Sequence, residues 1–499
     1  MHRSDLTKNF ALALSALFIA MAAWAVSSPM GSSPDDGFHL TSIMCGPLRT
    51  ENTCEQADSS PVLVPAAAIW SPCYAFDATV SGSCQVPRYT TEATALIDTT
   101  AVNKGFYPPG FYAFHSAFAS TDAYFTSYVV RLANIIIYVS MVALALLVAP
   151  PRNRRVLLVA QALVLTPLAI SIVPSTNPSS WAYTSVSLFG FVLISHFSPE
   201  NTRRSISTAL LLLTVIIGAL SRSDSVVWMV LIFMVIVVLK PHHRKLKKFD
   251  ALTGALACCI GAYAFMSSRQ DEMARGGLEA VREVGSIGST SQIDLDFHNL
   301  GEVVRLALGA VGPSPLGWLD TPMVSFVQIA GPIVILSAIF VRLGKADRRS
   351  NLAITLSIGF LFLTPMYLLR QGNYVVGEAI QARYFMPFLA AVMVVLLLPL
   401  RKYVFTVSKS QAFAFVLILS ISHTFALHSQ IRRYVTGTDV RGFNLNKGAE
   451  WWFASGSLLS PMSVWALGSA AFVVFLSLAF RELFDHQLLT TTQTVAVLP

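Results

Sequence analysis

Two adjacent aspartates, Asp35 and Asp36, follow the first long apolar segment of the chain, and His39 lies close behind them. Paired carboxylates can share the work of a general base: one accepts a proton while the other orients the reacting group or holds a cation. On a helix, Asp35 and His39 would share one face at a spacing of four residues. Asp35, Asp36 and His39 are therefore the candidate catalytic residues.

The same stretch also fits the start of a helix. Ser33 can serve as the N-cap, Pro34 stands at the favoured first helical position, and Asp36 falls where a capping box has its acid. Catalysis and capping are compatible, so the sequence leaves both interpretations open.

A second cluster, residues 104–115, combines aromatic side chains with paired prolines just before the second apolar segment. Adjacent prolines fix an extended backbone, and aromatic rings favour the headgroup level of a membrane. The cluster could line a substrate or form an interfacial belt. The candidate substrate-lining residues in it are Tyr107, Pro108, Pro109, Tyr112 and His115.

Arginines stand near the ends of two later apolar segments, on the same predicted side of the membrane as the aspartates. Arg383 could bind a phosphate bidentately, with hydrogen bonds added by Tyr384 and Gln381. Arg222 would lie at a similar depth, beside Asp224, which joins the substrate-lining set. The alternative for each arginine is a paired or snorkelling charge at a helix end.

Membrane-spanning helices are the elements that must position these groups. The 499 residues are 54% hydrophobic and only 12% charged, whereas a soluble domain has about 25% charged residues. Apolar runs long enough to cross ~30 Å of hydrocarbon recur along the chain. We therefore predict an all-α integral membrane protein. The twelve predicted spans are residues 9–28, 128–149, 155–173, 182–197, 206–220, 225–239, 250–267, 324–342, 351–368, 385–400, 411–427 and 462–480.

Lysine and arginine concentrate in the short loops on one side of these spans, as at residues 151–155 and 242–248. Such loops remain in the cytoplasm, so both chain ends are predicted there. Topology explains the basic loops, and no nucleic-acid partner is predicted. The first span, near the basic N-terminus, could instead be a cleaved signal peptide, although an uncleaved helix is the preferred interpretation.

Three segments on the opposite side are too long to be simple connectors. We call residues 29–127, 268–323 and 428–461 the first, second and third external segments. The second has a Gly/Ser-rich stretch followed by a predicted interfacial helix over residues 300–311. The remaining divisions are the first helix (1–28), two groups of spans (128–267 and 324–427), and the last span with a cytoplasmic tail (462–499).

Four cysteines, Cys45, Cys54, Cys73 and Cys84, lie in the first external segment. An oxidising compartment favours two disulfides, and three pairings are possible. The sequential pairing, Cys45 with Cys54 and Cys73 with Cys84, closes the shortest loops and is preferred. A zinc site is the alternative, although no CxxC spacing or paired histidines accompany these cysteines.

Several common motifs are missing from the sequence: a P-loop, a Rossmann glycine pattern, HExxH and a nucleophile elbow. A mechanism driven by a nucleotide or a soluble cofactor therefore has no support in the sequence, and no metal site is assigned.

The order of these features resembles the GT-C class of membrane glycosyltransferases: a first span, a long external segment that opens with paired acids, and about ten further spans. The chain resembles more closely an uncharacterised family of predicted bacterial membrane proteins with three short motifs. These motifs are Pro-Asp-Glu-x-x-His, Tyr-Pro-Pro before the second span, and Gln-Gly-Arg-Tyr-Phe-x-Pro at a late span. Here they stand at residues 34–39, 107–109 and 381–387, with Asp36 in place of glutamate and Ala382 in place of glycine.

The resemblance implies a GT-C-like bundle of about 12 helices in a bacterial plasma membrane. It also implies transfer of a sugar from a polyprenyl-phosphate donor to an envelope glycan, lipid or protein acceptor on the outer face. Asp35 or Asp36 would be the general base, and the other would orient the acceptor or bind a divalent cation. His39 would adjust the carboxylate pKa, while Arg383 and Arg222 would neutralise the departing phosphate. Arabinose or mannose would suit the resemblance as the sugar.

Two other functions compete with this one. A transporter or flippase of lipid-linked saccharides explains the span count equally well but leaves the long external segments unexplained. A structural or assembly protein of the envelope would use the paired acids for helix capping, and loss of a cap would cost about 1 kcal/mol.

Overall fold

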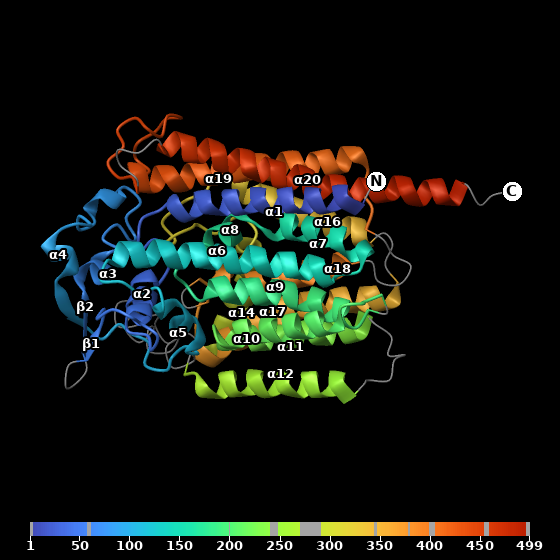
Figure 1. The fold of residues 1–499 in the computed structure, drawn as a ribbon, viewed down its shortest axis with the longest axis horizontal. Coiled ribbons are helices and arrows are strands. Elements are labelled where there is room, and N and C mark those ends of the chain that lie inside the picture. The colour runs from blue at the N-terminus through green and yellow to red at the C-terminus, as the bar shows by residue number, and fades with distance from the viewer. Residues whose placement is uncertain are drawn as a thin grey trace.

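The computed structural model describes residues 3–56, 61–198, 200–239, 248–269, 291–343, 347–377, 380–398, 405–453 and 459–495. Within these ranges the protein is mostly helical, and the long helices run side by side in one bundle (Figure 1). The N-terminal end of α1 (Arg3–Val26) and the C-terminal end of α20 (Pro461–Val495) lie at the same end of this bundle, and the first external segment covers the opposite end. Most of the basic loop 242–248 lies outside the described residues.

Six of the described helices are long and apolar enough to cross a membrane. Besides α1 and α20 they are α6 (Ala123–Val148), α16 (Ser325–Leu343), α17 (Arg348–Gly372) and α19 (Lys409–Val435). Shorter apolar helices are α10 (Arg204–Ala219), α11 (Ser223–Leu239), α18 (Met386–Leu397) and the part of α12 (Lys248–Ser267) from Leu252 onward. The prediction of a helical, multi-pass membrane protein is confirmed. Twelve as the number of spans, and the side of the membrane on which each end lies, stay predictions.

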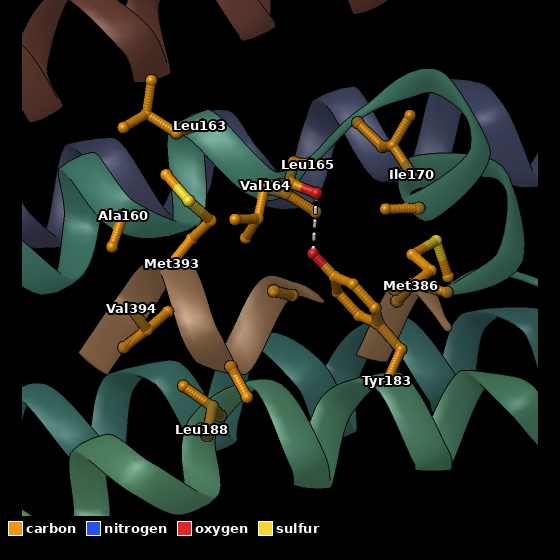
Figure 2. Packing of buried hydrophobic residues seen from close by; sticks show 14 of the residues in the cluster. Ala160, Leu163, Val164, Leu165, Ile170, Tyr183, Leu188, Met386, Met393 and Val394 are labelled. Carbon is orange, nitrogen blue, oxygen red and sulfur yellow. Dashed lines mark hydrogen bonds between the residues drawn. The ribbon is translucent and has the colours of Figure 1, made fainter. Parts of the chain in front are cut away.

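The predicted span 155–173 is wrong as one continuous helix. The structure divides it into α7 (Pro151–Val164) and α8 (Pro167–Ile172). Proline has no N–H to donate and its ring clashes with the preceding turn, so the helix ends before Pro167, and Thr166 caps the helix that follows. The carbonyl freed at Val164 accepts a hydrogen bond of 3.0 Å from the Tyr183 hydroxyl (Figure 2).

The centre of the bundle is α9 (Ser179–His196), in which every residue is buried. It packs against α6, α10, α11 and α18. Figure 2 shows Tyr183 and Leu188 of this helix in the same packed layer as Met393 of α18 and Leu163 of α7. A helix covered on all sides by protein does not need an apolar lipid-facing surface, which explains its many serines.

The first external segment has a small sheet as well as helices, so the all-α prediction is wrong for this part of the chain. Its three antiparallel strands lie in the order β1-β2-β3. They are β1 (Glu55–Gln56), β2 (Val62–Pro65) and β3 (Leu96–Thr99), and the short helices around them are α2 (Asp36–Met44), α3 (Ala66–Trp70), η1 (Gly82–Cys84), α4 (Thr91–Thr94) and α5 (Gly110–Ser116).

Two disulfides join Cys45 to Cys54 and Cys73 to Cys84. The preferred sequential pairing is confirmed, and all four cysteines are used in these bonds rather than in a zinc site. Each bond fixes one loop of the first external segment, close to α2 and to η1 respectively.

The described part of the second external segment holds α14 (Gln292–Glu302) and α15 (Val304–Gly309), which overlap the predicted interfacial helix. After α15 a tight loop is closed by an antiparallel bridge between Leu316 and Thr321. A short helix, η2 (Ala382–Tyr384), precedes α18 and carries Arg383. These pieces and the first external segment surround the candidate site.

Candidate active site

The loop after α1 turns the two aspartates in different directions. Asp35 has a left-handed backbone, with φ 60° and ψ 16°, and α2 begins at Asp36. This conformation is uncommon for residues other than glycine and is often found at functional sites. The predicted cap is found only in part. Ser33 does not cap the helix, but its backbone N–H donates to the Asp36 carboxylate at 3.4 Å.

Asp35 forms an ion pair with Arg383 across the site. Nη2 of Arg383 donates to Oδ2 of Asp35 at 2.8 Å, although the two residues are 348 positions apart in the sequence. The Asp35 side chain remains 41% exposed, whereas Arg383 is 6% exposed. Asp35 is therefore a carboxylate that is held in place and still accessible.

Two other nitrogens of the Arg383 guanidinium have no hydrogen-bond partner among the described residues. Nη2 also donates to the Tyr384 hydroxyl at 3.0 Å, but Nε and Nη1 are buried without hydrogen-bond partners. Buried charged donors without partners are costly, so two such N–H groups on one arginine indicate a place prepared for an anion.

Arg383 lines a pocket that also touches Pro34, directly before Asp35. The pocket is small, with a cavity volume of about 30 Å³, and it opens to solvent. Gln381 and Gln430 also line the pocket, and their side-chain oxygens are buried without a hydrogen-bond partner among the described residues. The lining also carries several hydroxyl groups, from Ser28, Ser32, Ser33, Ser171 and Ser314. The pocket thus offers donors to an anion and acceptors to hydroxyl groups.

A second arginine, Arg222, lies next to this pair. It forms a two-pronged ion pair with Asp224, with Nη2 to Oδ2 at 2.9 Å and Nε to Oδ1 at 3.0 Å. Its guanidinium carbon is 4.8 Å from the centre of the Tyr384 ring and 5.7 Å from that of Tyr107. Stacking on both rings fixes the cation in the site.

His39 is fully buried beside the aromatic cluster before the second span. Its Nδ1 shares a hydrogen bond of 2.9 Å with the Tyr112 hydroxyl, and its ring meets Tyr107 edge-on at 5.4 Å. Burial lowers the pKa of His39 to about 3, against the raising effect of Asp35. The imidazole is therefore neutral near pH 7 and positions the tyrosines rather than carrying charge.

Asp36 pairs with Arg131 rather than with Arg383 and is 1% exposed. Its nearest cation is Arg131 of α6, at 3.8 Å, and burial raises the pKa of Asp36 to about 6 against the lowering effect of Arg131. Arg131 also donates to the carbonyls of Ala25, Ser28 and Pro29 at 2.6–2.8 Å. These contacts fix the loop that presents Asp35.

The sequence interpretation missed Arg131. The available signal was an arginine inside the predicted span 128–149, because a charged residue within a span is rare and has a specific partner.

The structure brings together most of the predicted site residues and leaves Asp36, Pro108, Pro109 and His115 apart. Gln381 and Arg383 line the pocket, and Asp35 and Tyr384 contact Arg383. Arg222 stacks on Tyr384 and Tyr107 and joins the site through them. The outer members of the set are Asp224, bound to Arg222, and His39 and Tyr112, beside Tyr107. His115 instead is fully buried, with Nε2 bonded to Asn134 at 2.9 Å and its ring against Trp181. Pro108 is buried, and Pro109 is exposed at the start of α5.

The described residues do not fit a divalent cation at the paired acids. Asp35 and Asp36 are directed to different arginines, and within the described ranges no group of three or more His, Cys, Asp or Glu side chains converges.

Comparisons with known proteins identify a family. No curated protein and no solved structure matches the chain. The family described as "Predicted membrane protein (DUF2142)" matches residues 18–392, which include the loop with Asp35, both arginines and the first two external segments. Because this match covers well over half of the chain, the protein belongs to the DUF2142 family of predicted membrane proteins.

Proposed function

We propose that this protein is a GT-C-type glycosyltransferase that moves a sugar from a polyprenyl-phosphate donor to an envelope acceptor outside the membrane. The proposal rests on one observation above all. Arg383, which lines a pocket with hydroxyl and amide groups, binds an accessible carboxylate through Nη2 and has two further N–H groups without partners among the described residues. A phosphate ester of a sugar carries both an anion and hydroxyl groups, and it would satisfy both kinds of group at once.

The proposed reaction needs no nucleotide, because the phosphate ester already activates the sugar. The acceptor hydroxyl oxygen forms a bond to the anomeric carbon while the bond from that carbon to the phosphate oxygen breaks. Asp35 accepts the hydroxyl proton, and the lipid phosphate leaves with the electron pair. Arg383, with Arg222 nearby, offsets the negative charge that develops on the phosphate.

Asp35 is the better general base of the two aspartates. Its side chain is 41% exposed and ion-paired with Arg383, whereas Asp36 is buried against Arg131. A base must reach the proton that it removes, and only an accessible carboxylate can approach an incoming acceptor. Asp36 is assigned the supporting role of holding the loop.

The direct test is transfer of labelled sugar from a panel of polyprenyl-phosphate sugars by the purified protein in nanodiscs. Asp35→Asn should lose transfer from the donor that the parent consumes. Asp98→Asn is the matched control, because Asp98 is an exposed aspartate of the same external segment, in β3. If no donor is consumed, or if Asp35→Asn equals the parent, the proposal is wrong, and transport of a lipid-linked saccharide becomes the function to test.

A further inference from the structure

Two aromatic rings from different external segments, Phe76 and Trp318, meet beside the pocket wall. Their ring centres are 5.3 Å apart and their planes are inclined by 64°. Phe76 is 76% exposed. Trp318 stands between Gly317 and Leu319, and both of these residues line the pocket that contains Arg383. We call Phe76 and Trp318 the aromatic pair.

Trp318 is tied to the loop that carries the candidate base. Its Nε1 donates to the carbonyl of Gly31 at 2.8 Å, four residues before Asp35. Gly31 has φ +83°, and a Cβ there would lie 2.6 Å from the Ser71 hydroxyl, so this close approach requires glycine. The hydrogen bond from Trp318 to Gly31 therefore ties the aromatic pair rigidly to the loop that carries Asp35.

Phe76 is held in place by a buried network. Its backbone N–H donates to the Asp320 carboxylate at 3.1 Å, and Asp320 forms a 2.7 Å ion pair with Arg433, which is fully buried. Arg433 also donates to the carbonyls of Tyr74 and Asp77, on either side of Phe76, at 2.8 and 2.9 Å. Asp320 and Arg433 belong to the second and third external segments, so all three segments fix this ring.

The Phe76 ring gains little stabilising contact in the free protein. Phe76 has φ 66°, a conformation that favours glycine and is an outlier for a bulky residue. Apart from the edge contact with Trp318, its face is open to solvent. A strained backbone, fixed by a buried ion pair, that presents an exposed ring is typical of a preorganised binding surface rather than of packing.

We infer that the aromatic pair is a stacking platform for the glycan acceptor. The C–H face of a sugar ring is apolar and slightly positive, so it packs on the negative face of an aromatic ring while the hydroxyls stay in water. The exposed carboxylate of Asp77, next to Phe76, offers an acceptor for such hydroxyls and disfavours insertion of the ring into hydrocarbon. The inference deepens the proposed glycosyltransferase function and rests on it.

The test measures binding without any donor, so its result is independent of sugar transfer. Full-length protein in nanodiscs is titrated into fluorescent, soluble pentose and hexose oligosaccharides, and binding is followed by fluorescence anisotropy. Phe76→Gly removes the ring while giving the backbone the residue that its φ favours, so loss of folding does not confuse the result. Phe76→Tyr keeps the ring. Tyr89→Ala is the matched control, because Tyr89 is 87% exposed on the same external segment.

The parent should bind at least one oligosaccharide. Phe76→Gly should weaken that binding at least tenfold, which corresponds to about 1.4 kcal/mol, whereas Phe76→Tyr and Tyr89→Ala should stay within about twofold. The inference is overturned if Phe76→Gly binds the oligosaccharide as tightly as the parent does, or if no oligosaccharide binds the parent. It is also overturned if the substitution weakens contact of the protein with lipid instead of its binding of oligosaccharide. Oligosaccharide binding that depends on Phe76, together with no transfer from any donor, would retain the platform and reject the glycosyltransferase.

Discussion

Asp35 and Arg383 are separated by 348 residues in the chain, and their side chains meet at 2.8 Å. The ion pair joins the loop after the first helix to the short helix η2 before α18. It uses one terminal nitrogen of the guanidinium, and Nε and Nη1 have no hydrogen-bond partner among the described residues. A phosphate that binds there can also compete with Asp35 for Nη2, and this competition makes specific predictions about both residues.

Asp35→Asn should separate catalysis from donor binding. Transfer should fall by about 10²–10⁴-fold, because the amide cannot accept the acceptor proton. Binding of polyprenyl phosphate should be unchanged or tighter, since Arg383 loses its competing carboxylate. Steady-state transfer rates and a direct binding titration measure the two effects. An equal loss of transfer and of polyprenyl-phosphate binding would show that Asp35 maintains the structure of the site rather than accepting the proton.

Arg383→Lys should weaken the binding of polyprenyl phosphate by at least about tenfold. A lysine keeps the charge but lacks the several fixed N–H donors of the guanidinium. The titration compares this variant with Arg305→Lys, because Arg305 is an exposed arginine of the second external segment that pairs with Glu302. Equal affinities of Arg383→Lys and the parent would mean that the guanidinium does not bind the phosphate.

Asp36 should make the stability of the protein depend on pH. Its pKa is raised from 3.8 to about 6 in the folded state, because burial disfavours the charged form. The folded state therefore holds this proton more tightly than the unfolded state does. The resulting stabilisation is fully present below about pH 3.8 and is lost as the pH rises through about 6, and it amounts to about 3 kcal/mol.

The measurement is the melting temperature of the parent and of Asp36→Asn in nanodiscs between pH 4 and pH 8. Relative to the variant, the parent should lose stability across this range. Asp98→Asn should keep the slope of the parent, since Asp98 is exposed. Parallel curves for the parent and Asp36→Asn would contradict the raised pKa.

Removal of the Cys73–Cys84 disulfide by a double serine substitution should loosen the loop that carries Phe76. The bond spans 11 residues, and closing a loop of this size contributes about 3 kcal/mol by the chain-entropy argument. Limited proteolysis should then cut the first external segment faster. Cys258→Ser is the control, because Cys258 is an exposed free cysteine outside that segment. Unchanged cleavage would show that the Arg433 network is sufficient to hold the loop.

The sequence by itself determined the class of protein and most of the groups at the site. Long apolar runs, short distances between cysteines and local motifs are properties of contiguous residues, so a helical membrane protein, the sequential disulfides and the set of Asp35, Arg222 and Arg383 could all be predicted. Pro167, which divides residues 155–173, is a local feature of the same kind, and its missing N–H accounts for the break between α7 and α8.

Tertiary structure alone decided which aspartate pairs with Arg383 at the pocket and what holds the site together. Asp35 and Asp36 are neighbours of the same type, and only the left-handed turn at Asp35 directs them to different arginines. Arg131 and Arg433 act on backbone carbonyls far away in the chain. Such contacts depend on how helices and loops pack against one another, and local spacing carries no information about that packing.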